Sequence, residues 1–191
     1  MFNEMGTLME RLSRFQLGVR IILSLSAPII VSVHCPAGDT KKQIEFFLGT
    51  CFGSLDDISR VKSLAALLKW QNAPAEFANL GKPVNGGGYE SWVVRRDGEF
   101  YVVAVNQAPW VDEKLANVCS VVVESPRDAV LTELTRMVKL KKIHEEHEPL
   151  QTTYYFEYDS SAVERAMVSV AALDNGTAPV SLGVTGIRKK H

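Results

Sequence analysis

The apolar positions of this chain recur with two periods, one typical of helices and one typical of strands. From Ile44 to Leu55 the apolar residues are separated by alternating steps of three and one, which predicts an amphipathic helix. Thr40 and Gln43 form a capping box at its start. A second helix is expected to begin with Ser54 as its cap and Asp57 at its third position, and to stop before Pro74. Its predicted apolar face consists of Ile58, Val61, Leu64, Ala65 and Leu68.

The clearest strand pattern is "YESWVVRRDGEFYVVAVNQ", in which two apolar segments flank Asp97-Gly98. This dipeptide is favoured in two-residue hairpin turns, and Arg96 and Glu99 are placed to pair across it. Both faces of the hairpin are largely apolar, so we expect it inside a sheet that is covered on two sides. Three further segments are predicted strands: "VCSVVVE", "TTYYFEY" and "APVSLGVTGI".

Two long helices are expected between these later strands. One begins at Ser125-Pro126, a serine cap followed by proline at the first helical position. It is expected to end in the charged, solvated tip "KKIHEEHEP" before Pro149. The other begins at Ser161 and stops at Asn175-Gly176. Its predicted apolar face contains Val163, Met167, Val170 and Ala171.

The first residues predict a separate short helix, with a capping box at Thr7 and Glu10 and a stop at Gly18. A single short helix is unstable alone in water, so its apolar stripe must be buried against something. We therefore expect the stripe to contact a partner protein or a second copy of the chain. The stripe consists of Leu8, Leu12 and Phe15.

Residues 19–35 contain an uncharged run of thirteen residues, 21–33, which is shorter than the roughly 18 residues of a membrane span. We interpret the run as two buried strands joined at Ser26-Ala27-Pro28. The alternative is an export signal, but twenty mixed-charge residues precede the run and no clean A-x-A cleavage site follows it.

Together these elements predict an α+β fold, with a mixed, largely antiparallel sheet covered by several helices. The expected organisation is an N-terminal amphipathic helix at residues 1–18 that protrudes from the body, a single α+β domain at residues 19–187, and a basic tail at residues 188–191.

Composition narrows the functional class. The 191 residues are 46% hydrophobic and 23% charged, which supplies a full core without a metal or a disulfide. The net charge of −1 argues against a dedicated nucleic-acid binder, which usually carries a basic surface. Three scattered cysteines without a C-x-x-C pair favour a reducing cytoplasm, where thiols act as small buried hydrophobes.

Cys51 is the strongest candidate for chemistry, because Gly49 to Gly53 spells G-x-C-x-G, the cysteine form of a nucleophile elbow. An elbow requires a strand before the nucleophile, whereas Cys51 lies in a helical apolar stripe and should point into the core. We therefore interpret Cys51 as structural, with Gly49 and Gly53 allowing another backbone to approach closely.

His144 and His147 are the second candidate. On a helix, side chains three apart are neighbours that could share a metal. The apolar face of that helix has ended before these residues, and no third ligand is placed, so we expect no metal site and no cofactor. As a weaker alternative, either histidine is the base of a hydrolase or transferase that uses Cys51.

Other candidates are binding residues. Asn85-Gly86-Gly87-Gly88 leads into a strand and lacks the G-K-[ST] ending of a phosphate loop, so a hinge is expected. Gly183 to Gly186 spells the GXXG of KH domains but lacks their helical context. Trp110, in a loop, is a possible anchor for a partner. The candidate contacts for nucleic acid are Arg95, Arg96, Lys189 and Lys190.

The sequence therefore contains no convincing pair of nucleophile and general base, and no convincing set of metal ligands. The sequence therefore favours a non-enzymatic, cytoplasmic protein that acts by protein–protein binding, as an adaptor, chaperone or inhibitor, with itself or another protein as partner. The alternatives are the Cys51-dependent enzyme and a nucleic-acid-binding accessory protein.

Overall fold

A single antiparallel sheet dominates the structure. The computed structural model describes residues 38–75, 77, 87–110, 114–176 and 179–189. Its eight strands lie in the order β1-β2-β3-β4-β8-β7-β6-β5. The strands are β1 Gln71–Asn72, β2 Gly87–Arg96, β3 Glu99–Pro109, β4 Lys114–Val123, β5 Lys141–Glu148, β6 Gln151–Tyr158, β7 Arg165–Leu173 and β8 Val180–Lys189.

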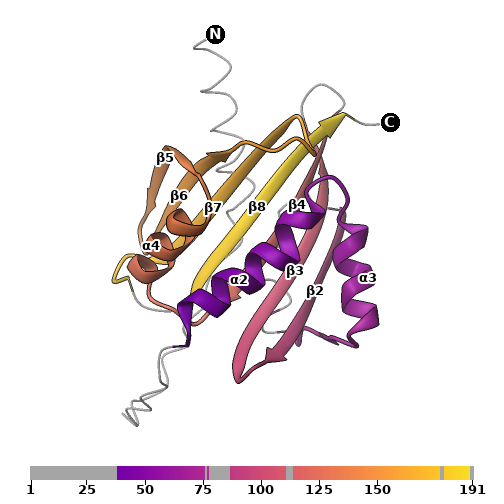
Figure 1. The fold of residues 1–191 in the computed structure, drawn as a ribbon, viewed down its shortest axis with the longest axis horizontal. Helices are drawn as coiled ribbons and strands as arrows, with labels where there is room; N and C mark the ends of the chain where they lie inside the picture. The colour runs from indigo at the N-terminus through magenta and orange to yellow at the C-terminus, as the bar shows by residue number, and fades with distance from the viewer. Residues whose placement is uncertain (1–37, 76, 78–86, 111–113, 177–178, 190–191) are drawn as a thin grey trace.

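The expected α+β class with several covering helices is wrong. Of the described residues, 49% lie in strands and 26% in helices, and the structure is closer to a β-rich fold with three α-helices. These are α2 Thr40–Cys51, α3 Ser59–Leu67 and α4 Arg127–Met137, with a short 3-10 helix, η1 Phe52–Ser54, after α2. All three α-helices lie on one face of the sheet (Figure 1).

The chain builds the sheet in two similar halves. In the first half α2 and α3 precede the antiparallel strands β1 to β4, and in the second half α4 precedes β5 to β8. The halves meet where β4 pairs with β8, in a register that runs from Lys114↔Lys189 to Val123↔Val180. Since α2 and α4 contact each other over this junction, one core spans both halves.

That core lies between the helices and the sheet. Ile44 and Phe47 from α2 and Val130 and Leu134 from α4 are completely buried. The strands contribute every second residue, as β7 does with Ala166, Val168, Val170 and Ala172, each at most 2% exposed. This alternation is the period expected of a strand with one face on the core.

The hairpin around Asp97-Gly98 is confirmed. Arg96 and Glu99 are register partners, and Asp97 and Gly98 both have positive φ, 54° and 84°, as a type I′ turn requires. Both faces of β3 are buried, since Val102 is 3% and Val103 0% exposed. The side chains across the turn do not pair with each other: Arg96 lies 3.4 Å from Asp97, and Glu99 accepts from the Asp39 amide at 3.0 Å.

Two predicted helical segments are strands. The helix expected from Ser161 is β7, because its apolar residues face both sides of the sheet: Met167, on the face opposite Val168, is only 3% exposed. Apolar residues on both faces of a strand leave no alternation in the sequence that would distinguish it from a helix. The helix from Ser125-Pro126 ends at Met137, and the expected charged tip is the edge strand β5.

Helix α2 is confirmed, although its cap is Asp39 rather than Thr40: the Asp39 carboxylate accepts from the Lys42 amide. Helix α3 begins at Ser59, later than expected. The predicted helix at residues 1–18 and the predicted strands in residues 19–35 lie outside the described residues. Within the described part of the chain, no helix has the length and apolar character needed to cross a membrane.

Candidate functional site: the α2–α3 junction

The connection between α2 and α3 is held by local hydrogen bonds. The Ser54 hydroxyl donates to the Cys51 carbonyl at 2.8 Å, which closes the 3-10 turn after α2. Asp57 accepts from the Ser59 amide at 2.9 Å and from its hydroxyl at 2.8 Å. The residue before α3 is Ile58, and the Asp57 side chain, not that of Ser54, accepts from the first amide of the helix. These hydrogen bonds from Ser59, side chain first, hold the pKa of the Asp57 carboxyl below its ordinary 3.8.

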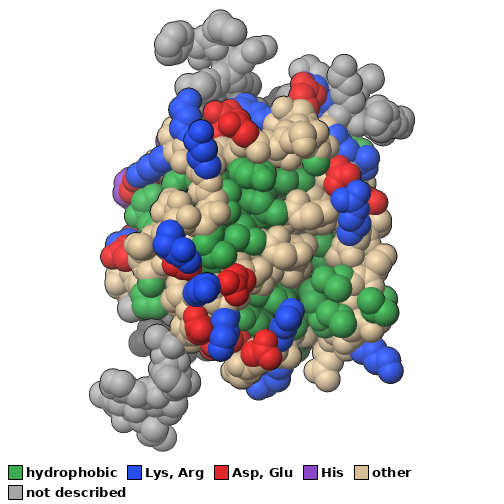
Figure 2. Space-filling view, in the orientation of Figure 1, with side chains coloured by type: hydrophobic (Ala, Val, Ile, Leu, Met, Phe, Trp, Pro, Cys, Tyr) green, Lys and Arg blue, Asp and Glu red, His purple; other side chains and the backbone are tan. Residues whose placement is uncertain are grey.

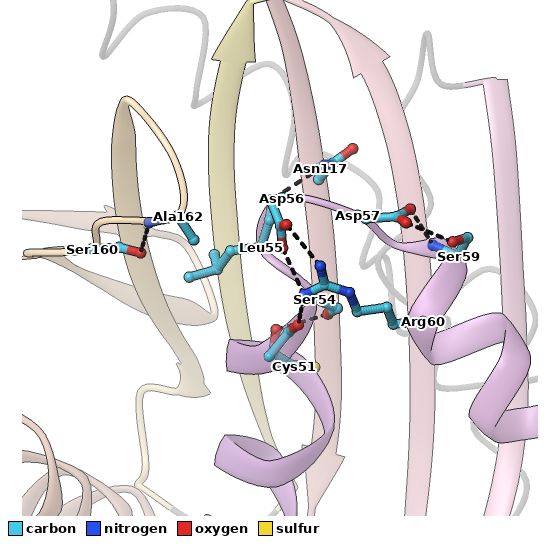
Figure 3. A network of polar contacts seen from close by, with 11 residues as sticks. Cys51, Ser54, Leu55, Asp56, Asp57, Ser59, Arg60, Asn117, Ser160 and Ala162 are labelled. Atoms are coloured by element: carbon cyan, nitrogen blue, oxygen red, sulfur yellow. Dashed lines mark hydrogen bonds and ion pairs between the residues drawn. The ribbon is translucent and has the colours of Figure 1, made fainter.

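Arg60 braces the same connection from its outer side. One guanidinium nitrogen donates to the Gly53 carbonyl at 2.7 Å, and both terminal nitrogens contact the Asp56 carboxylate at 3.0 and 2.9 Å. Figure 3 shows Arg60 reaching back from α3 over the turn toward Asp56. The planar guanidinium thus fixes the loop at two points.

The sheet holds the connection from beneath. The Asn117 side chain in β4 donates to the Leu55 carbonyl at 3.1 Å, and Gln107 in β3 donates to Asn117 at 2.8 Å. Gly186 in β8 allows the close approach, because a Cβ at this position would lie 2.3 Å from the Leu55 carbonyl oxygen. The loop backbone therefore rests directly on the strand.

A disulfide adds a covalent tie. Cys51, at the end of α2, is bonded to Cys119 in β4, at a sequence separation of 68 and with their Cα atoms 5.4 Å apart. Both residues are buried, at 0% and 2% exposure. Cys51 does point into the core, as the helical stripe predicted, but the expectation of free thiols is wrong for this pair. The Cys51 sulfur has no thiolate to offer as a nucleophile.

This rigid support presents an apolar surface. Phe52 packs edge-on against Tyr158 of β6, with ring centroids 5.0 Å apart. Leu48 lies one helical turn before Phe52 on the same side of the helix, and Val163 precedes β7 in a loop where the Ala162 amide donates to the Ser160 hydroxyl at 3.2 Å. All four apolar side chains are half-buried. We call Leu48, Phe52, Tyr158 and Val163 the junction surface.

The surroundings of the junction surface are open. Gly49 and Gly53 are exposed, and no atom of the described residues lies within 4 Å of a Cβ built on either. Among the described residues, no backbone approaches these two glycines, so the other backbone that they were expected to admit is not one of the described segments. Figure 2 shows hydrophobic side chains at the surface of this face, between the positions of α2 and α4 in Figure 1.

His144 and His147 lie on β5, where residues three apart point to opposite faces. They therefore cannot share a metal, as a helix would have allowed. On one face, His147 Nδ1 is 3.0 Å from the Thr152 hydroxyl, which donates to Asp174 at 2.7 Å. Among the described residues, no group of three or more histidine, cysteine or acidic side chains is placed to hold a metal.

On the other face, His144 stacks on Tyr155, with ring centroids 5.8 Å apart. Tyr155 is 4% exposed and donates to the Glu146 carboxylate at 3.0 Å. Burial, and then the charge of Glu146, raises the pKa of the Tyr155 hydroxyl far above its ordinary value. Both histidines lie on β5, an edge strand of the described sheet, whereas Cys51 lies at the end of α2.

The remaining candidates are dispersed. Arg95 lies over the Phe100 ring at 5.5 Å, and Trp110 is half-buried beside Lys114. Gly183 and Gly186 are inside β8, which extends to Lys189, so they form no loop. Lys190 and the stripe of Leu8, Leu12 and Phe15 lie outside the described residues.

Sequence reasoning missed Tyr158, Val163 and Asn117 as parts of one site. Asn117, a lone amide at the start of an apolar strand, was the available signal, because such a side chain requires a partner when buried. No family model, no curated protein and no solved structure matches the chain.

Proposed function

We propose that this chain is a non-enzymatic binding domain that holds a segment of another polypeptide on the junction surface. The observation that supports the proposal is the half-exposed aromatic pair Phe52 and Tyr158. Phe52 lies on the connection that a disulfide, Asn117 and Arg60 hold in place, and Tyr158 lies in β6. Aromatic side chains are enriched in the energetically dominant parts of protein interfaces.

The chemistry of the partner follows from the surface. Apolar side chains of a partner would displace water from the four apolar residues, at roughly 25 cal/mol per Å² of apolar area. Gly49 and Gly53 leave room for a partner's backbone or side chains beside Phe52. Because the loop is already ordered, little conformational entropy remains to be lost there on binding.

The two alternatives receive less support. A Cys51-dependent hydrolase requires a thiolate, and the Cys51 sulfur is bonded to Cys119. For nucleic acid, Arg95 and Arg96 lie beside Phe100 and Asp97, respectively, and no basic cluster forms with them among the described residues. Homo-oligomerisation is contained in the proposal, since a second copy is one possible polypeptide partner.

The test is site-specific photo-crosslinking in the native source. A photoreactive phenylalanine analogue replaces Phe52, and the matched control carries it at Glu45, an exposed position on α2, the helix before Phe52. We expect one discrete adduct from position 52 and none from position 45. Mass spectrometry identifies the partner, and an adduct of twice the chain mass identifies a second copy.

A second pair of variants separates binding from folding. Phe52→Ser should abolish co-purification of the crosslinked partner, whereas Leu67→Ser, at an apolar residue that is 77% exposed elsewhere, should retain it. Adducts of equal yield at both positions, or retention of the partner by a folded Phe52→Ser protein, would contradict the proposal.

A further inference from the structure

The Cys51–Cys119 bond constrains where the protein can mature. The two Cα atoms are 5.4 Å apart, within the usual range for a disulfide, and both residues are buried in the core. Disulfides form and persist in oxidising compartments and are rare where cellular reductants keep thiols reduced. The pairing therefore points away from the reducing cytoplasm that the scattered cysteines suggested.

The segment before the domain provides a second, independent observation. The uncharged run at residues 21–33 has thirteen residues and follows directly on Arg20. An export signal has an apolar segment of about 7–15 residues behind a positively charged start, followed by small residues two apart. Cys35 and Ala37 are such a pair, with cysteine in place of the first alanine of A-x-A, and α2 with its Asp39 cap begins just beyond them.

The number of cysteines agrees with cleavage at this place. The chain has three cysteines, and an odd cysteine in an exported protein is left either to pair with another molecule or as a free reactive thiol. Cleavage after Ala37 removes Cys35 and leaves only Cys51 and Cys119, which are bonded to each other. Every cysteine of the cleaved domain is then paired.

We infer that residues 21–33 direct the chain into an oxidising compartment, that it is cleaved there after Ala37, and that Cys51 and Cys119 are then oxidised to the disulfide. This inference does not depend on the proposed binding function. In the oxidation, two thiols lose two protons and two electrons as the sulfur–sulfur bond forms. The electrons reduce the disulfide of a thiol–disulfide oxidoreductase, which leaves as a dithiol.

The experiment expresses the full chain in a bacterium that has a reducing cytoplasm and an oxidising periplasm. The double variant Leu23→Arg/Ile30→Arg places charges in the run, and Leu23→Ile/Ile30→Leu is the matched control that keeps it apolar. Cell fractionation locates each protein. Acid quenching and alkylation with a mass tag count free thiols, and N-terminal sequencing reads the start of the chain.

For the wild type and the apolar control we expect a periplasmic protein that begins Gly-Asp-Thr and takes up no tag before reduction and two tags after it. The charged variant should remain in the cytoplasm, uncleaved, with three taggable thiols. A periplasmic protein with free Cys51 and Cys119, a product that retains Cys35, or a disulfide that forms equally well in the cytoplasmic charged variant would overturn the inference.

Discussion

Removing the bond between Cys51 and Cys119 should cost this domain a large part of its stability. The bond closes a loop with a sequence separation of 68 residues. In the chain-entropy treatment, a loop of this length lowers the entropy of the unfolded chain enough to stabilise the fold by about 4 kcal/mol at 25 °C. At roughly 2–4 °C per kcal/mol for a domain of this size, the melting temperature should fall by ~8–16 °C.

The assay is equilibrium urea unfolding, followed by far-ultraviolet circular dichroism, with and without a thiol reductant. With a slope of roughly 2 kcal/mol per molar urea, the reductant should lower the wild-type midpoint by about 2 M. Cys51→Ala/Cys119→Ala should unfold near the reduced wild type and show no response to the reductant. These proteins are prepared as the uncleaved chain. Cys35→Ser is then the matched control, because it leaves the bonded pair intact and should retain the full response.

Equal wild-type midpoints in the presence and absence of reductant would refute this reasoning, provided that tagging confirms reduction. A double variant with the stability of the oxidised wild type would refute it as well. A response lost in Cys35→Ser would show that Cys35 takes part in the bond, and the described pairing would then be wrong.

Three further predictions concern single positions. Gly186→Ala places a Cβ 2.3 Å from the Leu55 carbonyl oxygen and should lower the free energy of unfolding by ~1–3 kcal/mol. Gly49→Ala, in open space on α2, should instead raise the free energy of unfolding by about 0.5–1 kcal/mol. Thermal melts of the two variants test both predictions. Asp57→Ala should cost ~1 kcal/mol at pH 7. Hydrogen bonds from Ser59 hold the pKa of Asp57 below 3.8 in the folded state, so this advantage of the wild type is fully present above pH 3.8 and is lost as pH falls through the lowered pKa. The difference between the urea midpoints of wild type and variant should therefore be smaller at pH 3 than at pH 7. Tyr155→Phe should lower the free energy of unfolding by ~1–3 kcal/mol at neutral pH, since the Glu146 carboxylate loses its donor. Burial raises the pKa of the Tyr155 hydroxyl above 10 in the folded state. The wild type should therefore lose stability above pH 10 more steeply than the variant.

The junction surface could not be assembled from the sequence. Phe52 was placed in the apolar stripe of a helix, where all members were expected to be buried. Its surroundings depend on β6, more than a hundred residues later in the chain, which brings Tyr158 beside it. Pairing at such separation has no local sequence signal, because side-chain periodicity reports only which face of one element is apolar.

The sequence by itself determined the elements whose signals are local. The period of apolar residues before Cys51 produces α2 with that cysteine on its buried side, and Asp97-Gly98 produces the hairpin because both residues adopt positive φ at little cost. Segments 141–148 and 165–173 were decided by the tertiary structure. Neither stretch has a local pattern that excludes a helix, and β6 and β8 supply the hydrogen bonds that select the strand. The disulfide was decided in the same way, since Cys51 and Cys119 meet only after α2 lies across β4.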